Sequence, residues 1–133
     1  MAGEKDLALL IKGMKPKLNE GDYVFATVKD LSKINRNDTI CEFKESEGVT
    51  IIIEKRIADE LRLEYGYIAA WITLTIHSSL DAVGFTALFS AVLAQNDISC
   101  NVISGYYHDH IFVPKADAKR TVHVLTEWSK NHS

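Results

Sequence analysis

The order of strand and helix signals in the second half of the chain limits the folds that it can adopt. Residues 70–77 alternate apolar and polar side chains, which is typical of a half-buried strand. We expect a helix over 82–95, strands over 98–103 and 108–113, and a last helix opened by Pro114, because proline suits the first helical turn. This β-α-β-β-α order predicts an α+β fold, in which helices cover one face of an antiparallel sheet.

The first half of the chain gives a more degenerate version of the same pattern. Apolar residues with helical spacing over 7–14 predict an amphipathic helix, which Gly13 and Pro16 end. A strand over 23–28, a hairpin of 40–44 with 49–53 and a short helix follow. We therefore predict two halves, residues 1–67 and residues 68–133, each with its own sheet and helices.

Composition excludes several classes of protein. Hydrophobic residues make up 47% of the chain and charged residues 25%, as in a folded globular domain. The net charge of −3 and the pI of about 5.9 argue against a nucleic-acid partner, which requires a basic surface. The apolar stretches are too short to span a membrane, and the first residues have no signal-peptide core. We expect a cytoplasmic protein.

Two stretches carry a family resemblance. Residues 73–87 (TLTIHSSLDAVGFTA) resemble the first strand, loop and helix of an ACT-type regulatory domain, and residues 106–114 (YYHDHIFVP) resemble its third strand. The whole chain resembles a small bacterial family of stand-alone ACT-domain proteins of unknown function. In that family an N-terminal piece with a Met-x-Pro and a Gly-x-Tyr-Val-Phe pattern comes first, as at residues 14–16 and 21–25 here.

The resemblance implies two ferredoxin-like βαββαβ halves, of which residues 1–67 are the degenerate one. It also implies a non-enzymatic regulatory module without a cofactor, which pairs into a homo-oligomer, binds an amino acid at the paired interface and regulates a partner protein. The pattern ends one strand early, since the last helix leaves no residues for a fourth strand. We expect the first half or a second chain to supply that strand, unless the sheet lacks it.

The candidate binding site is the start of the helix predicted over 82–95. A helix N-terminus offers free N–H groups and a positive dipole, which suit a carboxylate, and a glycine at position 84 permits close approach. Polar groups nearby, including Asp109 as the resemblance implies, suit an ammonium. The predicted ligand-binding residues are Ser78, Ser79, Leu80, Asp81, Val83, Gly84, Phe85, Asp109 and His110.

Simpler interpretations remain open. Ser79 or Asp81 could only cap the helix, and its nearly all-apolar sequence predicts burial on more than one side. On a strand, His108 and His110 face the same way and Asp109 faces the other, so the two histidines with His77 could instead form a metal-dependent enzyme. A purely structural or interaction protein is the third possibility.

Overall fold

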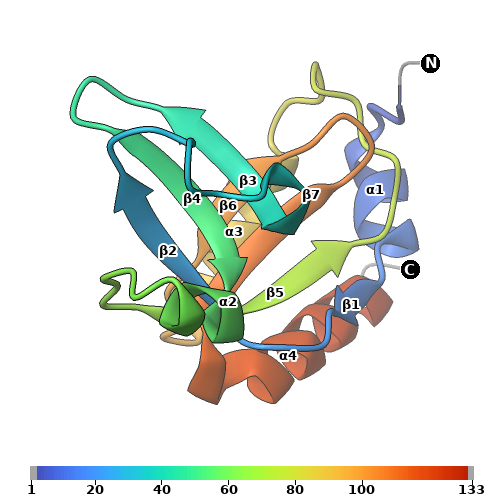
Figure 1. Cartoon of the computed structure of the whole chain (residues 1–133). Helices are drawn as coiled ribbons and strands as arrows, with labels where there is room; N and C mark the ends of the chain where they lie inside the picture. Colours follow the sequence, from blue (N-terminus) through green and yellow to red (C-terminus); the bar gives the residue numbers. More distant parts are fainter. Residues whose placement is uncertain (1–2, 132–133) are drawn as a thin grey trace. The chain divides into compact units, whose positions relative to one another are not determined.

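The computed structural model describes residues 3–131, and these residues form two compact units (Figure 1). Of the described chain, unit 1 contains residues 3–19 and 70–131, and unit 2 contains residues 20–69. The units therefore differ from the sequence halves, because residues 3–19 pack with the second half of the chain. The predicted boundary between residues 67 and 68 stays a prediction.

Unit 1 contains four strands and three α-helices. The elements are α1 (Leu7–Gly13), β1 (Pro16–Leu18), the end of β5 (Ile68–Leu74), α3 (Phe85–Gln95), β6 (Asn101–Ser104), β7 (Asp109–Pro114) and α4 (Ala118–Lys130), with the 3-10 helix η2 (Lys115–Asp117) before α4. The strand order is β1-β5-β7-β6. The helix over 7–14, the strand over 108–113 and the last helix are confirmed within a few residues.

Strand β1 is the fourth strand that the second half lacks. It pairs antiparallel with β5 in the register Pro16 with Leu74, Lys17 with Thr73 and Leu18 with Ile72. Two further bonds extend the pairing, because the Thr75 N–H and hydroxyl both donate to the carbonyl of Lys15, at 2.9 and 2.6 Å. The first half of the same chain therefore completes the sheet, and no second chain is needed for it.

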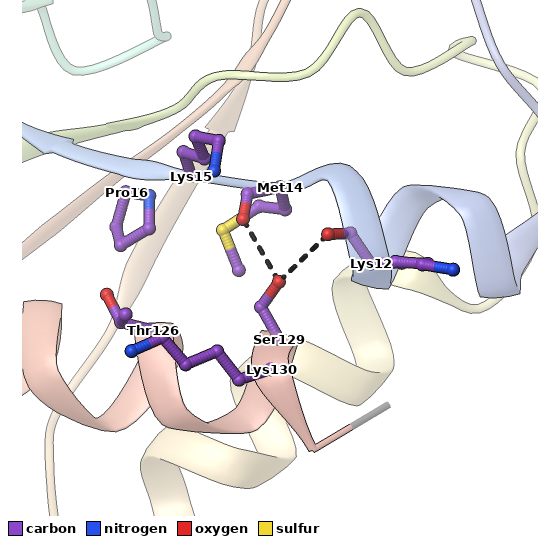
Figure 2. Close-up of a pocket in the computed structure, with 7 residues that line it drawn as sticks. All are labelled: Lys12, Met14, Lys15, Pro16, Thr126, Ser129 and Lys130. Carbon is purple, nitrogen blue, oxygen red and sulfur yellow. Dashed lines mark hydrogen bonds between the residues drawn. The ribbon is translucent and has the colours of Figure 1, made fainter. Parts of the chain in front are cut away.

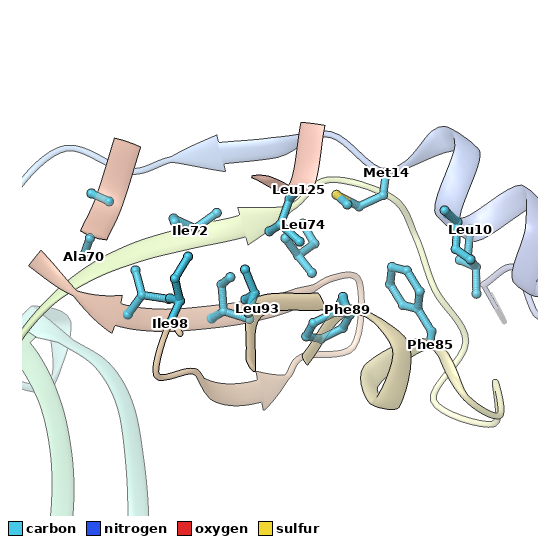
Figure 3. Packing of buried hydrophobic residues seen from close by; sticks show 14 residues of the cluster. Leu10, Met14, Ala70, Ile72, Leu74, Phe85, Phe89, Leu93, Ile98 and Leu125 are labelled. Atoms are coloured by element: carbon cyan, nitrogen blue, oxygen red, sulfur yellow. The ribbon is translucent and has the colours of Figure 1, made fainter. Parts of the chain in front are cut away.

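The core of unit 1 lies between its sheet and its three α-helices (Figure 3). Ile72 and Leu74 of β5 face Phe89 and Leu93 of α3, and Leu125 of α4 closes the same cluster. All five side chains are fully buried. Complete burial of a large apolar side chain contributes roughly 1.5–3 kcal/mol, so this cluster holds α3 and α4 against β5.

Helix α3 departs from two sequence predictions. It begins at Phe85 rather than near residue 82, and it buries a single stripe, Phe85, Phe89 and Leu93. The prediction that it is buried on more than one side is wrong: Ala87, Ala91 and other small residues of its second face are exposed. An apolar composition does not distinguish a helix that is covered on two sides from one that leaves small residues in solvent.

Unit 2 repeats the strand plan without a first helix. Its elements are β2 (Tyr23–Val28), the 3-10 helix η1 (Arg36–Asp38), β3 (Thr39–Lys44), β4 (Val49–Glu54), α2 (Lys55–Glu60) and the beginning of β5. The sheet order is β3-β4-β2 followed by residues 68–69 of β5. A loop and η1 stand where a ferredoxin-like unit has its first helix, which confirms the degenerate character predicted for this half.

Both units are α+β, with antiparallel strand pairs and helices packed on the sheet. Across residues 3–131, no helix is long and apolar enough to cross a membrane.

Candidate functional site

The loop between β5 and α3 contains most of the predicted ligand-binding residues, and they differ in exposure. Ser78 is buried, while Leu80 and Val83 are 66% and 85% exposed. Phe85 is buried and its ring meets that of Phe89 edge to face, with ring centroids 5.2 Å apart. Phe85 is therefore a core residue, and Leu80 and Val83 point to solvent.

A buried carboxylate joins this loop to β7. Asp109 is only 6% exposed, and its two carboxylate oxygens accept one hydrogen bond from the Ser78 hydroxyl at 3.2 Å and one from the Ser104 hydroxyl at 2.7 Å. Ser104 is the cross-strand partner of Asp109 in the β6–β7 hairpin. Within residues 3–131, no lysine or arginine forms an ion pair with Asp109.

The sequence pattern predicts that Asp109 approaches the loop, but it does not indicate Ser104. The hairpin register that places Ser104 opposite Asp109 could have been inferred from the turn between the two strands. The folded chain thus brings together a buried carboxyl group and two hydroxyl groups from three separate segments.

The first turn of α3 has no side-chain cap. Its N-cap is Gly84, with φ of 97°, a left-handed conformation that glycine tolerates. Ser79 and Asp81 do not cap the helix as predicted. The Ser79 hydroxyl accepts from the Asp81 N–H at 3.1 Å, and Asp81 lies before Phe85, the first residue of α3. In the described chain no acceptor contacts the N–H groups of residues 85–87, which leaves the positive end of α3 available.

The loop is partly occupied by the N-terminal segment. The Glu4 N–H donates to the carbonyl of His77 at 2.8 Å, and the Ser79 N–H donates to the carbonyl of Glu4 at 2.9 Å. Three residues after Glu4, the side chain of Leu7 lies against Gly84. Nothing in the sequence pattern signals this contact, because it depends on backbone atoms of residues far apart in the chain.

His110 lies on the sheet face opposite to Asp109. Side chains alternate between the two faces along a strand, so Asp109 shares a face with Ile111 and Val113, which pack in the core. His110 therefore points to the other face. There its Nδ1 atom accepts from the Trp71 indole N–H at 3.0 Å and lies 3.1 Å from the Thr73 hydroxyl. The structure therefore brings Ser78 and Asp109 together but does not bring His110 to them.

The environment of His110 favours its neutral form. Burial lowers the pKa of His110 below its ordinary value of 6.5, and the nearby His108 lowers it further, while Asp109 acts in the opposite direction. A neutral ring whose Nδ1 accepts hydrogen bonds carries its proton on Nε2. His110 thus acts here as an acceptor that links β7 to β5.

The three histidines of the alternative metal hypothesis are not assembled. His77 lies against Tyr106 and Tyr107, with ring centroids 6.2 and 5.3 Å away, while the His108 and His110 rings are 6.3 Å apart and perpendicular. Over residues 3–131, no three His, Cys, Asp or Glu side chains are grouped as metal ligands would be.

A cavity of about 630 Å³ opens between the end of α1 and helix α4 (Figure 2). Ser129 is one of the lining residues, and its hydroxyl donates to the carbonyl of Ile11 at 2.7 Å. Three lysines line the cavity, but the Lys12 side chain extends away from it (Figure 2), so their charges do not converge. None of the predicted ligand-binding residues lines this cavity.

Comparison with known proteins finds two family matches, one after the other along the chain. Residues 2–70 and residues 67–127 each match the ACT domain family. Among proteins with curated functions, none matches the chain.

Solved structures resemble the chain over most of its length. A protein of unknown function from Vibrio cholerae, described as a possible transport protein, is 44% identical over 94% of this chain and 97% of its own, with a TM-score of 0.83. A protein from Agrobacterium tumefaciens is 18% identical over 87% and 89%, with a TM-score of 0.69. The ligand-free regulatory subunit of aspartate kinase from Thermus thermophilus is 9% identical over 84% and 95%, with a TM-score of 0.57. The last two likenesses show the fold alone. With two family matches that together span nearly the whole sequence, this chain belongs to the ACT domain family and holds two ACT domains in tandem.

Proposed function

We propose that this chain is a non-enzymatic regulatory module that binds a small zwitterionic metabolite, most simply an amino acid, beside the start of α3. The observation that carries the proposal is the buried carboxylate of Asp109, held by two serine hydroxyls. A buried charge is costly unless it is paired, and these hydroxyls offset only part of that cost. A ligand ammonium would supply the missing positive charge.

The first turn of α3 would bind the other end of the same ligand. Its free N–H groups and helix dipole favour a carboxylate, and the absence of a side chain on Gly84 leaves the approach open. Ser78 belongs to the segment that leads into this helix and also contacts Asp109, so the two sites are linked by a few residues. An amino acid carries both complementary charges on one carbon.

Membership of the ACT domain family supports a regulatory role, and both matches are to ACT domains rather than to a catalytic domain. We propose that ligand binding changes how the module engages a partner protein or a second copy of the chain. The exposed apolar face of α3, where Leu88 is 39% exposed, is the surface proposed for the homo-oligomer.

Thermal-shift measurements with each of the twenty amino acids, followed by calorimetry on the best ligand, test the proposal. A ligand at 100 times its Kd stabilises the folded state by about 2.7 kcal/mol, which is a clear shift in melting temperature. Asp109→Asn should weaken binding by roughly 10–100-fold, because hydrogen bonds to a charged group contribute about 1.5–3 kcal/mol.

Asp97→Asn is the matched control, since Asp97 is exposed at the other end of α3 and asparagine tolerates its positive φ of 59°. This variant should bind like the unchanged protein. The absence of stabilisation by every amino acid at millimolar concentration would refute the proposal, as would equal affinity in Asp109→Asn.

A further inference from the structure

Residues 3–7, which we name the strap, cross the loop that leads into α3. Glu4 and Ser78 form an isolated parallel β-bridge, made by the two backbone hydrogen bonds that join Glu4 to His77 and to Ser79. The strap continues into α1, whose first residue, Leu7, has its Cδ2 atom 3.6 Å from where a Cβ of residue 84 would lie. Both the beginning and the end of the strap therefore contact the candidate site.

The bridge requires glycine at position 3. A Cβ atom on residue 3 would lie 2.6 Å from the carbonyl oxygen of His77 and 2.7 Å from the amide nitrogen of Ser79. Both are backbone atoms, which cannot move aside as the end of a flexible side chain can. Any larger residue at position 3 must displace the strap or the loop.

The strap occupies a backbone donor of the loop that leads into the candidate site. The Ser79 N–H donates to the carbonyl oxygen of Glu4 at 2.9 Å, and a ligand carboxylate that reached this loop would be an acceptor of the same kind. Such a carboxylate would compete with Glu4 for this donor, because one N–H makes one strong hydrogen bond.

Among the described residues, the two backbone hydrogen bonds of Glu4 and the partly buried side chain of Leu7 hold the strap closed. The side chains of Glu4, Lys5 and Asp6 are exposed. Glu4 Oε1 accepts from the backbone N–H groups of Lys5 and Asp6 at 3.0 and 2.9 Å, and Asp6 caps α1, so these bonds stay within the strap and its helix. Segments with exposed hydrogen bonds and little buried apolar surface open most readily.

We propose that the strap is an internal competitor of the ligand: closed, it covers the loop and occupies the Ser79 N–H, and ligand binding displaces it. This inference rests on the proposed function. It implies that the apparent affinity is reduced by the closed fraction, so that a strap closed 90% of the time weakens binding about tenfold.

Hydrogen exchange and calorimetry on Gly3→Ala test the inference. Without ligand, we expect the Ser79 amide to exchange at least about tenfold faster in Gly3→Ala than in the unchanged protein. We also expect the best amino acid from the thermal-shift series to bind several-fold more tightly. Glu4→Pro, which removes the N–H that donates to His77, should have the same two effects by a different route.

Gly66→Ala is the matched control, because nothing lies within 4 Å of a Cβ at this exposed glycine. It should leave exchange and affinity unchanged. Unchanged exchange of the Ser79 amide in both Gly3→Ala and Glu4→Pro would overturn the strap itself. Faster exchange with unchanged affinity would overturn the competition. If no amino acid binds either the unchanged protein or Gly3→Ala, the proposed function fails and the competition with it, while the exchange rates still report whether the strap opens.

Discussion

Ser129→Ala tests whether the N-terminal segment is held in unit 1 by α4. The Ser129 hydroxyl is buried and donates to the carbonyl of Ile11 at 2.7 Å, with the carbonyl oxygens of Lys12 and Met14 at 3.3 and 3.2 Å (Figure 2). These carbonyls lie at the end of α1, where the last turn of a helix lacks internal donors. The serine therefore ties α4 to the segment that leads into β1.

The expected loss of stability in Ser129→Ala follows from the carbonyl oxygens that lose their hydrogen-bond donor. Removing the donor from a buried carbonyl costs about 1–3 kcal/mol. The cavity of about 630 Å³ beside Ser129 admits water, which can replace part of the lost bond. We therefore expect the free energy of unfolding to fall by about 1.5 kcal/mol, within the range for an orphaned acceptor.

Urea denaturation followed by circular dichroism measures this difference. Ser90→Ala is the control, because the Ser90 hydroxyl donates to the Ala87 carbonyl of its own helix, at 3.2 Å, and holds no other segment of the described chain. This change should stay within about 0.5 kcal/mol. A loss below about 0.5 kcal/mol in Ser129→Ala would refute the reasoning. The N-terminal segment would then be held by β1 pairing and apolar packing alone.

Two further predictions concern His110 and Gly84. Burial, and to a smaller extent His108, lower the pKa of His110 in the folded state below 6.5. The folded state therefore favours the neutral ring, and this contribution to stability is fully present above pH 6.5. It is lost as the pH falls through the lower pKa of the folded state. Urea titrations at pH 7.5 and pH 5 (about one unit above and one and a half units below the ordinary value) should show a smaller loss of stability in His110→Gln than in the unchanged protein. The exposed control His123→Gln should match the unchanged protein, and equal losses in all three would contradict this account. Gly84→Ala should cost about 1–2 kcal/mol because φ is 97° there, as measured by thermal unfolding, whereas a cost equal to that of Gly66→Ala would show that the backbone is not strained.

Local patterns were sufficient for most of the elements. The helical spacing over 7–14 and the β-branched run over 23–28 predicted α1 and β2, and the hairpin of β3 and β4 followed from its glycine-containing turn. The start of α3 was predicted three residues early, because Ser79 and Asp81 are good caps in isolation. In the folded chain the positive φ of Gly84 ends the loop, and the burial of Phe85 begins the helix there.

The candidate site was predicted in part. Strand alternation correctly separated Asp109 from His110, yet only the fold showed that Asp109 meets Ser78 and Ser104 while His110 meets Trp71. The list of expected residues included Leu80 and Val83, whose side chains point to solvent. Sequence order places residues along a loop, but the direction of each side chain depends on the neighbours that pack against it.

The amino-acid sequence by itself determined the α+β class and most of the helices and strands, because these depend on periodicity and turn residues within a few positions. The ACT-type pattern was indicated by the resemblance of residues 73–87 and 106–114 to that family. The tertiary structure alone decided that β1 completes the sheet of the second half, that the strap covers the loop before α3, and that Asp109 is buried among hydroxyls. Each of these contacts joins segments far apart in the chain. Such pairings form only when the packing of the whole unit offsets the entropy of bringing its segments together.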